Sequence, residues 1–275
     1  MSEKNCKGKT PEDYGFHMPE KKNSFKIDLN EKSSVKKIIG VVSGKGGVGK
    51  SFVTSMLACE MARRGYRVGV LDGDITGPSQ TKAFGIHEKA MGDGKYIYPY
   101  ITKNGIQVIS TNMILDSDET PVIWRGPMVA NILKQFYTDV VWDNVDYMFV
   151  DMPPGTSDVP LTAFQSFPLD GIVVVTSPQE LVSMVVEKAI NMAQSMDIKV
   201  LGLIENMSYV ECPNCNEKIE IFGKSHINEV SEKYGLPVLA KIPMRQKVAA
   251  SADDGTMEDL EIPEIKDAVS FIEGK

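Results

Sequence analysis

An eight-residue glycine-rich stretch is the clearest chemical signal in the chain. It reads GKGGVGKS and matches the pattern G-x-x-x-x-G-K-[ST]. Glycines allow successive backbone N–H groups to curve around a phosphate chain with no Cβ in the way. A helix N-terminus beneath the loop would add further donors and a partial positive charge. The stretch therefore predicts a P-loop that binds a nucleotide through Gly44, Lys45, Gly46, Gly47, Val48, Gly49, Lys50 and Ser51.

Two side chains of this loop suit the phosphates and their metal ion. We expect Lys50 to contact the β and γ phosphates as a point charge and Ser51 to offer its hydroxyl to Mg²⁺. The flanking segments support this reading, because residues 37–43 form a short apolar run and residues 52–64 carry apolar residues at helical spacing. Strand, glycine loop and helix in this order are the usual context of a P-loop. The alternative is a glycine-rich turn that binds nothing.

A second lysine, Lys45, stands near the start of the loop. Such a lysine cannot easily fold back onto its own loop's phosphate. We predict that it crosses a two-fold interface and reaches the partner's γ-phosphate, which is the role of an arginine finger. A solvated surface lysine is the alternative. The loop resembles the deviant P-loop class of nucleotide-driven dimers, in which this lysine acts in trans.

Carboxylates follow two other predicted strands. Asp72 and Asp74 come directly after residues 68–71, and Asp151 ends the run 146–151. Ligands of open parallel sheets bind at the carboxyl ends of the strands. We expect Asp72 to hold a Mg²⁺-bound water, Asp74 to position or deprotonate the attacking water, and Asp151 to act as the Walker B carboxylate. A plain Asp-Gly-Asp turn is the alternative for the first pair.

An amide follows the predicted strand 199–204. Asn206 can accept a hydrogen bond from the adenine amino group and donate one to a ring nitrogen. The Asn-Lys-x-Asp signature of many GTPases is missing from the sequence. We therefore expect ATP rather than GTP.

A Cys-x-x-Cys pair, Cys212 and Cys215, lies between this strand and the next helix. Its acidic neighbours argue against a thioredoxin-like redox pair, which needs positive surroundings. Cys59 is expected in a helix core, Cys6 is isolated, and His226 has no partner histidine. One chain thus supplies two good metal ligands. A two-fold dimer would bring four thiolates together, which could hold zinc or a [4Fe–4S] cluster.

Strands and helices alternate along the chain, which predicts an α/β fold with a mostly parallel sheet and helices on both faces. Residues 1–36 are rich in Lys, Glu, Asn and Ser and are expected to form a flexible N-terminal arm. Residues 37–275 are expected to form one P-loop ATPase domain, which carries the Cys-x-x-Cys loop and closes with an acidic tail and one short helix.

The overall charge and hydropathy exclude some classes of partner. The 275 residues carry a net charge of −7 and the pI is near 5.2, which argues against gripping nucleic acid by bulk electrostatics. No apolar run is long enough to span a bilayer, and the lysine-rich N-terminus has no apolar core of a signal peptide. We expect a cytoplasmic protein that binds neither nucleic acid nor membrane. In a reducing compartment its cysteines are expected as metal ligands or buried thiols.

Several segments together resemble one family, the Mrp/ApbC-type P-loop ATPases that carry iron–sulfur clusters. They are GKGGVGKS at 44–51, DGDITGPS at 72–79, ETPVIWRGPM at 119–128, DYMFVDMPPGTSD at 146–158 and ENMSYVECPNC at 205–215. The resemblance implies a homodimer that binds ATP in each subunit and bridges a [4Fe–4S] cluster with Cys212 and Cys215 of both chains. It further implies transfer of that cluster to apo-proteins, with slow ATP hydrolysis. A zinc-stabilised nucleotide switch and a partition or positioning ATPase are the alternatives.

Overall fold

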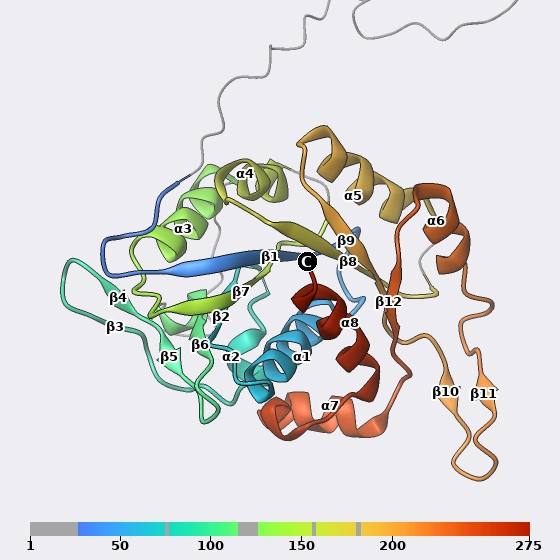
Figure 1. Ribbon diagram of the computed structural model, residues 1–275. Coiled ribbons are helices and arrows are strands. Elements are labelled where there is room, and N and C mark those ends of the chain that lie inside the picture. Colours follow the sequence, from blue (N-terminus) through green and yellow to red (C-terminus); the bar gives the residue numbers. More distant parts are fainter. Residues whose placement is uncertain (1–26, 75–76, 115–125, 156–157, 180–182) are drawn as a thin grey trace, which may run out of the picture.

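The computed structural model describes residues 27–74, 77–114, 126–155, 158–179 and 183–275. Its centre is an eight-stranded sheet with the order β12-β9-β8-β1-β7-β2-β6-β5 (Figure 1). All neighbouring pairs are parallel except β5 and β6. The strands of this sheet are β1 (Val35–Ser43), β2 (Val68–Asp72), β5 (Tyr100–Ile101), β6 (Gln107–Ile109), β7 (Val145–Asp151), β8 (Gly171–Thr176), β9 (Val200–Glu205) and β12 (Val238–Lys241).

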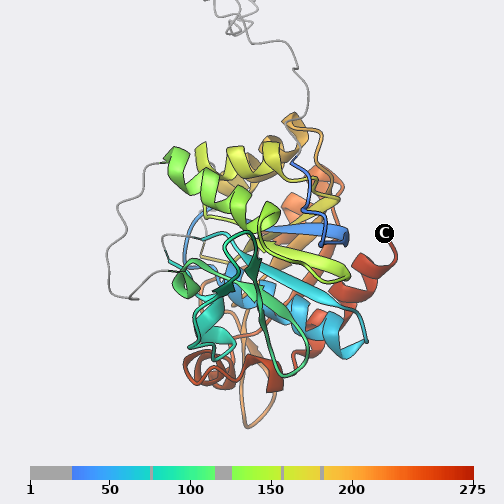
Figure 2. The same ribbon diagram turned by 90° about the vertical axis from the view of Figure 1, so that its left-hand side faces the viewer.

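Helices cover both faces of the sheet, as Figures 1 and 2 show from two directions. One face carries α3 (Gly126–Thr138), α4 (Asp158–Ser166) and α5 (Ser183–Ser195), with α6 (Ile227–Tyr234) packed beside α5. The opposite face carries α1 (Lys50–Arg63) and α8 (Pro263–Glu273), which pack on each other. The short helix α2 (Gln80–Ala83) contacts α1 and α7 (Gln246–Asp253). The predicted α/β architecture is confirmed.

The central strands are apolar because helices cover both of their faces. Every residue of β2 and β8 is buried, and so is β1 from Ile38 to Ser43. Such β-branched runs without alternation are typical of parallel strands buried on both sides. The register aligns Asp72 at the end of β2 with Asp151 at the end of β7. The sheet therefore delivers these two carboxylates to one point on its carboxyl edge.

Two small antiparallel hairpins extend from this core. The excursion expected between residues 85 and 105 contains β3 (Met91–Gly92) paired with β4 (Ile97–Tyr98). The second hairpin, β10 (Val210–Glu211) with β11 (Lys218–Ile219), follows β9 and projects away from the body of the domain (Figure 1). Two 3₁₀ turns, η2 (Thr111–Met113) and η3 (Met257–Asp259), complete the elements.

The two ends of the chain differ in part from expectation. The acidic C-terminal tail, predicted to hold one short helix, forms both α7 and α8. The expected final helix is α8, whose apolar stripe is buried at Ile265, Ala268, Val269 and Ile272. The additional helix is α7, and none of its residues is buried. At the other end, the Ile27 N–H donates to the Ser166 carbonyl at 3.1 Å. Residues 1–26 of the expected arm, with Cys6, lie outside the described residues, and the boundary at residue 36 remains a prediction.

Among the helices of the described ranges, none is both long enough and apolar enough to cross a bilayer.

Candidate functional site

The glycine-rich stretch forms the turn between β1 and α1, as its pattern predicts. Gly47 has φ 85° and Gly49 has φ 81°, both in the left-handed region that favours glycine. A Cβ on Gly49 would collide with the Asn206 amide, whereas a Cβ on Gly46 would meet nothing within 4 Å. The Gly49 carbonyl accepts the Val53 N–H at 3.0 Å and so begins the helix. The geometry is that of a P-loop at a helix N-terminus.

Lys50 lies inside the molecule, and its partner is the Walker B carboxylate. Its side chain is 5% exposed, and its Nζ forms an ion pair with Oδ1 of the fully buried Asp151. The Thr54 hydroxyl donates to the Lys50 carbonyl at 3.0 Å and approaches the same carboxylate oxygen at 3.4 Å. A buried carboxylate without such partners would be costly. The structure therefore brings together two of the predicted site residues directly.

The second oxygen of Asp151 is held by a residue that the sequence analysis did not single out. Gln80 is completely buried, and its Nε2 donates to Asp151 Oδ2 at 2.9 Å and to the Ser51 carbonyl at 3.1 Å. The Ser55 hydroxyl donates to Gln80 Oε1 at 2.8 Å. The glutamine thus connects the P-loop helix to the Walker B strand. In the sequence, only its position eight residues after Asp72 could have indicated that Gln80 belongs to the site.

Asp72 is buried beside Asp151 and is surrounded by donors. The Ser110 hydroxyl donates to its Oδ2 at 3.0 Å, and the N–H groups of Ser79 and Gln80 donate to the same oxygen at 3.2 Å. Burial, and next the charge of Asp151, raise the pKa of Asp72 to about 7. Two carboxylates and one lysine therefore share a dry site at the carboxyl ends of β2 and β7.

The remaining P-loop candidates lie at its rim. Asp74 is half-buried, and its Oδ1 accepts the Gly77 N–H at 3.3 Å. Lys45 is exposed, and its carbonyl accepts the Ser43 hydroxyl at 2.8 Å. Asn206, at the end of β9, donates from Nδ2 to the Val48 carbonyl at 3.0 Å. The amide expected near adenine thus contacts the P-loop itself.

The cysteine pair lies in the turn between β10 and β11. The Cys212 N–H donates to the Glu217 carbonyl, and the Asn216 N–H donates to the Cys212 carbonyl, both at 2.9 Å. Cys215 is exposed and Cys212 is half-buried. Hydrogen bonds from the Asn214 and Cys215 N–H groups, and then from the Cys215 thiol, lower the pKa of Cys212. The pair is part of a hairpin and not of the strand-to-helix turn of a thioredoxin.

No third metal ligand joins the two thiols within the described ranges. No group of three Cys, His, Asp or Glu side chains suited to a metal ion occurs there. The ring of His226 contacts Glu229 at 3.0 Å, and Cys59 is a buried core residue, as expected. Burial raises the pKa of Cys59 to about 12. A single chain therefore offers one exposed and one half-buried thiol on the hairpin, and no complete metal site in this part of the structure.

Comparison with known proteins agrees with the P-loop and with the thiol pair. The family model described as NUBPL iron-transfer P-loop NTPase, of the ParA group, matches residues 34–273. The chain belongs to this iron-transfer P-loop NTPase family. Two curated relatives are named iron–sulfur cluster carrier protein. The one from Clostridium perfringens is 46% identical over 82% of each chain, and the one from Methanocaldococcus jannaschii is 44% identical over 81% of this chain and 78% of its own.

Solved structures place the iron-transfer NTPase among nucleotide-binding proteins. A nucleotide-binding protein from Archaeoglobus fulgidus in complex with ADP has a TM-score of 0.76 and 38% identity, covering 84% of this chain and 91% of its own. The cell-division ATPase MinD from Pyrococcus furiosus has a TM-score of 0.62 at 19% identity, covering 86% of this chain and 98% of its own. The second likeness concerns the fold alone.

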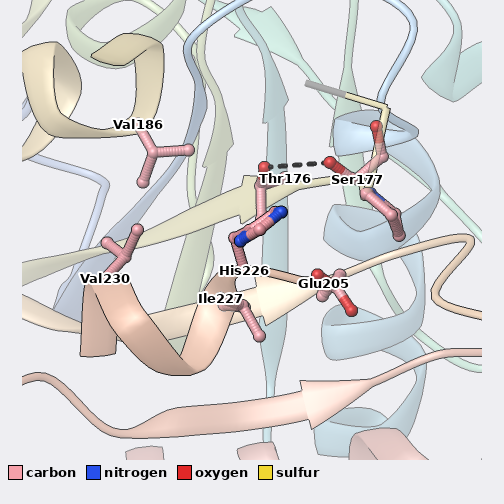
Figure 3. A pocket seen from close by; sticks show the side chains of 8 residues that line it. Thr176, Ser177, Val186, Glu205, His226, Ile227 and Val230 are labelled. Carbon is pink, nitrogen blue, oxygen red and sulfur yellow. Dashed lines mark hydrogen bonds between the residues drawn. The ribbon is translucent and has the colours of Figure 1, made fainter. Parts of the chain in front are cut away.

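A small cavity in the iron-transfer NTPase lies near the carboxyl ends of β8 and β9. Figure 3 shows Thr176, Glu205 and His226 around it, with Val186 and Val230 on the helix side. Its volume of ≈ 10 Å³ is sufficient for about one water molecule. The cavity is too small for a nucleotide, so the P-loop remains the candidate nucleotide site. Glu205 was not singled out by the sequence analysis, although it directly precedes Asn206.

Proposed function

We propose that this chain is an ATP-binding and ATP-hydrolysing homodimeric carrier that binds [4Fe–4S] clusters and transfers them to apo-proteins. The observation that carries the proposal is an exposed thiol pair on a hairpin of a P-loop NTPase domain. The hairpin begins five residues after β9 ends, and β9 leads directly to the amide that contacts the P-loop. The residue that contacts the P-loop and the hairpin that carries the thiols therefore lie on one continuous segment, which starts at the end of β9.

In this proposal the P-loop holds the triphosphate of ATP. The backbone N–H groups of residues 44–51 surround the phosphates, and Lys50 exchanges its ion pair with Asp151 for the β and γ phosphates. The Asp151 carboxylate, released from Lys50, would then be available to the metal ion of the nucleotide. ADP in the relative from Archaeoglobus fulgidus supports a nucleotide here.

The donor set of the site suits Mg²⁺, which prefers oxygen ligands. Ser51 would contribute its hydroxyl, and Asp72 and Asp151, which are in register at adjacent strand ends, would accept hydrogen bonds from the metal's waters. When bound, Mg²⁺ would neutralise charge on the phosphates. Asp74 would take a proton from the water that attacks the γ-phosphorus, while the bond to the β-phosphate oxygen breaks and ADP leaves. Lys45 of the partner subunit would stabilise the developing charge.

The cluster is the cargo of this reaction. One [4Fe–4S] cluster requires four thiolates, and Cys212 and Cys215 supply two from each chain. Because both thiols lie at the surface, a second copy can approach them across a two-fold axis. Two exposed apolar side chains, Ile219 of β11 at 48% and nearby Ile221 at 56%, agree with a surface that a partner covers.

Anaerobic reconstitution with iron and sulfide tests this proposal. We expect about four irons and four sulfides per dimer in the wild type, with a cluster absorbance that is absent in Cys212→Ala. Cys59→Ala is the matched control, since Cys59 is a buried thiol outside the hairpin, and it should load normally. Tightly held zinc with no cluster would instead identify the pair as a structural zinc staple of a nucleotide switch.

A further inference from the structure

One buried carboxylate fastens both ends of the cysteine-bearing segment. Here this segment, residues 208–225, is called the cysteine loop. Glu205 is 1% exposed, and its Oε2 accepts the Ser208 hydroxyl at 2.5 Å. Its Oε1 accepts the Ser225 hydroxyl at 2.6 Å. The first and last residues of the cysteine loop are thus hydrogen-bonded to the last residue of β9.

The start of the cysteine loop is also fixed by its backbone. The Ser208 N–H donates to the Ile242 carbonyl at 2.9 Å, and the Ile242 N–H donates to the Glu205 carbonyl at 2.8 Å. Met207 precedes Ser208 and has φ 56°, a left-handed backbone conformation that is strained for a residue other than glycine. Strain of this kind persists only where the surroundings hold it. The chain therefore leaves β9 along a fixed path.

The two residues after Glu205 contact the nucleotide loop. Asn206 donates to the Val48 carbonyl at 3.0 Å, and its own N–H donates to Thr176 at the end of β8. The Met207 methyl lies 3.7 Å from the position that a Cβ on Gly49 would occupy. Three consecutive residues at one strand end thus connect the cysteine loop on one side with the P-loop on the other.

The surroundings of Glu205 leave little room for independent motion. Figure 3 shows Glu205 beside the end of β8 and the start of α6, around a cavity with a volume of only ≈ 10 Å³. The hydroxyl bonds to the carboxylate are of the charge-assisted kind, which are short and strong. Breaking one would leave a buried acceptor unsatisfied. A displacement of the strand end at the P-loop therefore displaces the anchors of the cysteine loop.

We propose that Glu205 is a positioning residue that couples nucleotide occupancy of the P-loop to the geometry of the Cys212–Cys215 hairpin. This inference rests on the proposed function, because it takes the P-loop as the nucleotide site and the thiols as cluster ligands. A nucleotide that moves the Val48 carbonyl shifts Asn206, and Glu205 transmits the shift to Ser208 and Ser225. The cysteine loop then holds its thiols differently in the two nucleotide states.

Thiol alkylation measures this coupling without any cluster. Metal-free, reduced protein is treated with iodoacetamide, with and without MgADP, and modification of Cys212 and Cys215 is followed by peptide mass spectrometry. We expect MgADP to change the wild-type rate about fivefold or more. Ser225→Ala and Ser208→Ala should reduce that ratio to about one. Ser225→Thr keeps the hydroxyl and should retain the wild-type response.

Two controls separate coupling from simple destabilisation. Cys59 is buried, so its alkylation reports opening of the whole domain and should stay slow in every variant. Ser195→Ala removes an exposed hydroxyl that bonds only locally, to the Met192 carbonyl, and should leave the response unchanged. If Cys59 is alkylated rapidly in one serine variant, that variant is destabilised. The comparison then uses the other serine variant and Ser225→Thr.

The outcomes distinguish this inference from the proposed function. Calorimetry of MgADP binding is run on the same samples. Normal binding with no effect on the wild-type thiol rates overturns the coupling and leaves the carrier proposal standing. Normal binding with a full response in both serine variants overturns the role of Glu205. Absence of nucleotide binding in the wild type contradicts the proposed function itself.

Discussion

Among single side chains, Lys50 and Asp151 form the pair on which the nucleotide site depends. The two charges are buried together; Thr54 approaches the carboxylate oxygen that Lys50 contacts, and Gln80 donates to the other oxygen. A buried pair of this kind contributes little net stability, but loss of one partner is costly because the other charge remains unpaired. Because Lys50 is also the proposed phosphate ligand, its removal should affect both stability and binding.

Lys50→Ala should therefore abolish nucleotide binding and lower the free energy of unfolding by about 3–5 kcal/mol. Adding Asp151→Asn removes the stranded charge and should restore most of that stability without restoring binding. Urea unfolding and calorimetry measure the two effects. Lys36→Ala is the control, since Lys36 is 73% exposed in its pair with Asp146 and should change stability by less than about 1 kcal/mol. Equal costs for the two lysines would contradict the buried pair.

Asp72 makes stability depend on pH. Its folded pKa of about 7 lies above the ordinary value of about 4, so the folded state binds more protons between these two pH values. The free energy of unfolding contributed by Asp72 is then highest at low pH, falls as pH rises through this window and is constant above it. Between pH 5 and pH 8 the loss is on the order of 2 kcal/mol.

The Asp72→Asn side chain cannot ionise, so this variant should lack the fall in the free energy of unfolding between pH 5 and pH 8. The measurement is urea unfolding of the nucleotide-free protein at pH 5, 6, 7 and 8, comparing the slopes of the two proteins and not their absolute stabilities. Slopes that coincide would mean that Asp72 is ionised throughout and has an ordinary pKa.

The loops at the strand ends differ in how strictly their backbone is determined. In the P-loop, Gly49 has both a left-handed φ and the Asn206 amide against it, whereas Gly46 has open space around it. The protein's own backbone and packing thus require glycine at position 49. At position 46 the reason for glycine would be the close approach of a ligand to the loop. The pattern of glycines in the sequence does not distinguish these two reasons.

Gly49→Ala should cost on the order of 1–3 kcal/mol of stability, because a Cβ is strained at this φ and displaces Asn206. Gly46→Ala should change stability by less than about 0.5 kcal/mol, yet weaken nucleotide binding, since its Cβ would stand where phosphate approaches the backbone. Thermal unfolding and calorimetry on both variants provide the comparison. A stable Gly49→Ala protein with normal affinity would refute the first expectation.

The sequence predicts the elements that have strong local signals. The run 37–43, the glycine loop and the strand-terminal Asp72 and Asp151 lie where their patterns indicate, because parallel strands must bring their carboxyl ends to one edge. Gln80 and Glu205 were missed, since a buried polar side chain is recognised by its partners and these come from distant parts of the chain. α7 was missed because its helix buries none of its own residues and has a weak apolar pattern.

At the scale of the whole molecule, the described residues offer a candidate nucleotide site and a thiol pair, which is half of the four-thiolate ligand set proposed for the cluster. Lys45, like the thiol pair, is proposed to act with a second copy of the chain. It is exposed at the start of the loop, and its proposed target is the phosphate of that copy. In the proposed mechanism both features become functional only in a two-fold assembly. The homodimer is therefore the central element of the proposed mechanism.

Lys45→Ala should leave nucleotide affinity nearly unchanged and slow ATP turnover about tenfold or more. Mixed dimers make this test specific. If Lys45 acts across the interface, mixing slow Lys45→Ala chains with inactive Asp74→Asn chains creates one complete site per mixed dimer, so activity rises above that of either variant alone. If Lys45 acts within its own chain, neither site is complete and the mixture shows no such rise.

The most direct test of the carrier account is cluster transfer. Wild-type protein loaded with iron and sulfide is mixed with an apo-enzyme that needs a [4Fe–4S] cluster, in the presence of a chelator that captures free iron. The account predicts that enzyme activity is recovered with the loaded wild type and not with Cys212→Ala or Cys215→Ala treated in the same way. Recovery that is equal with the cysteine variants, or that the chelator abolishes, would contradict it.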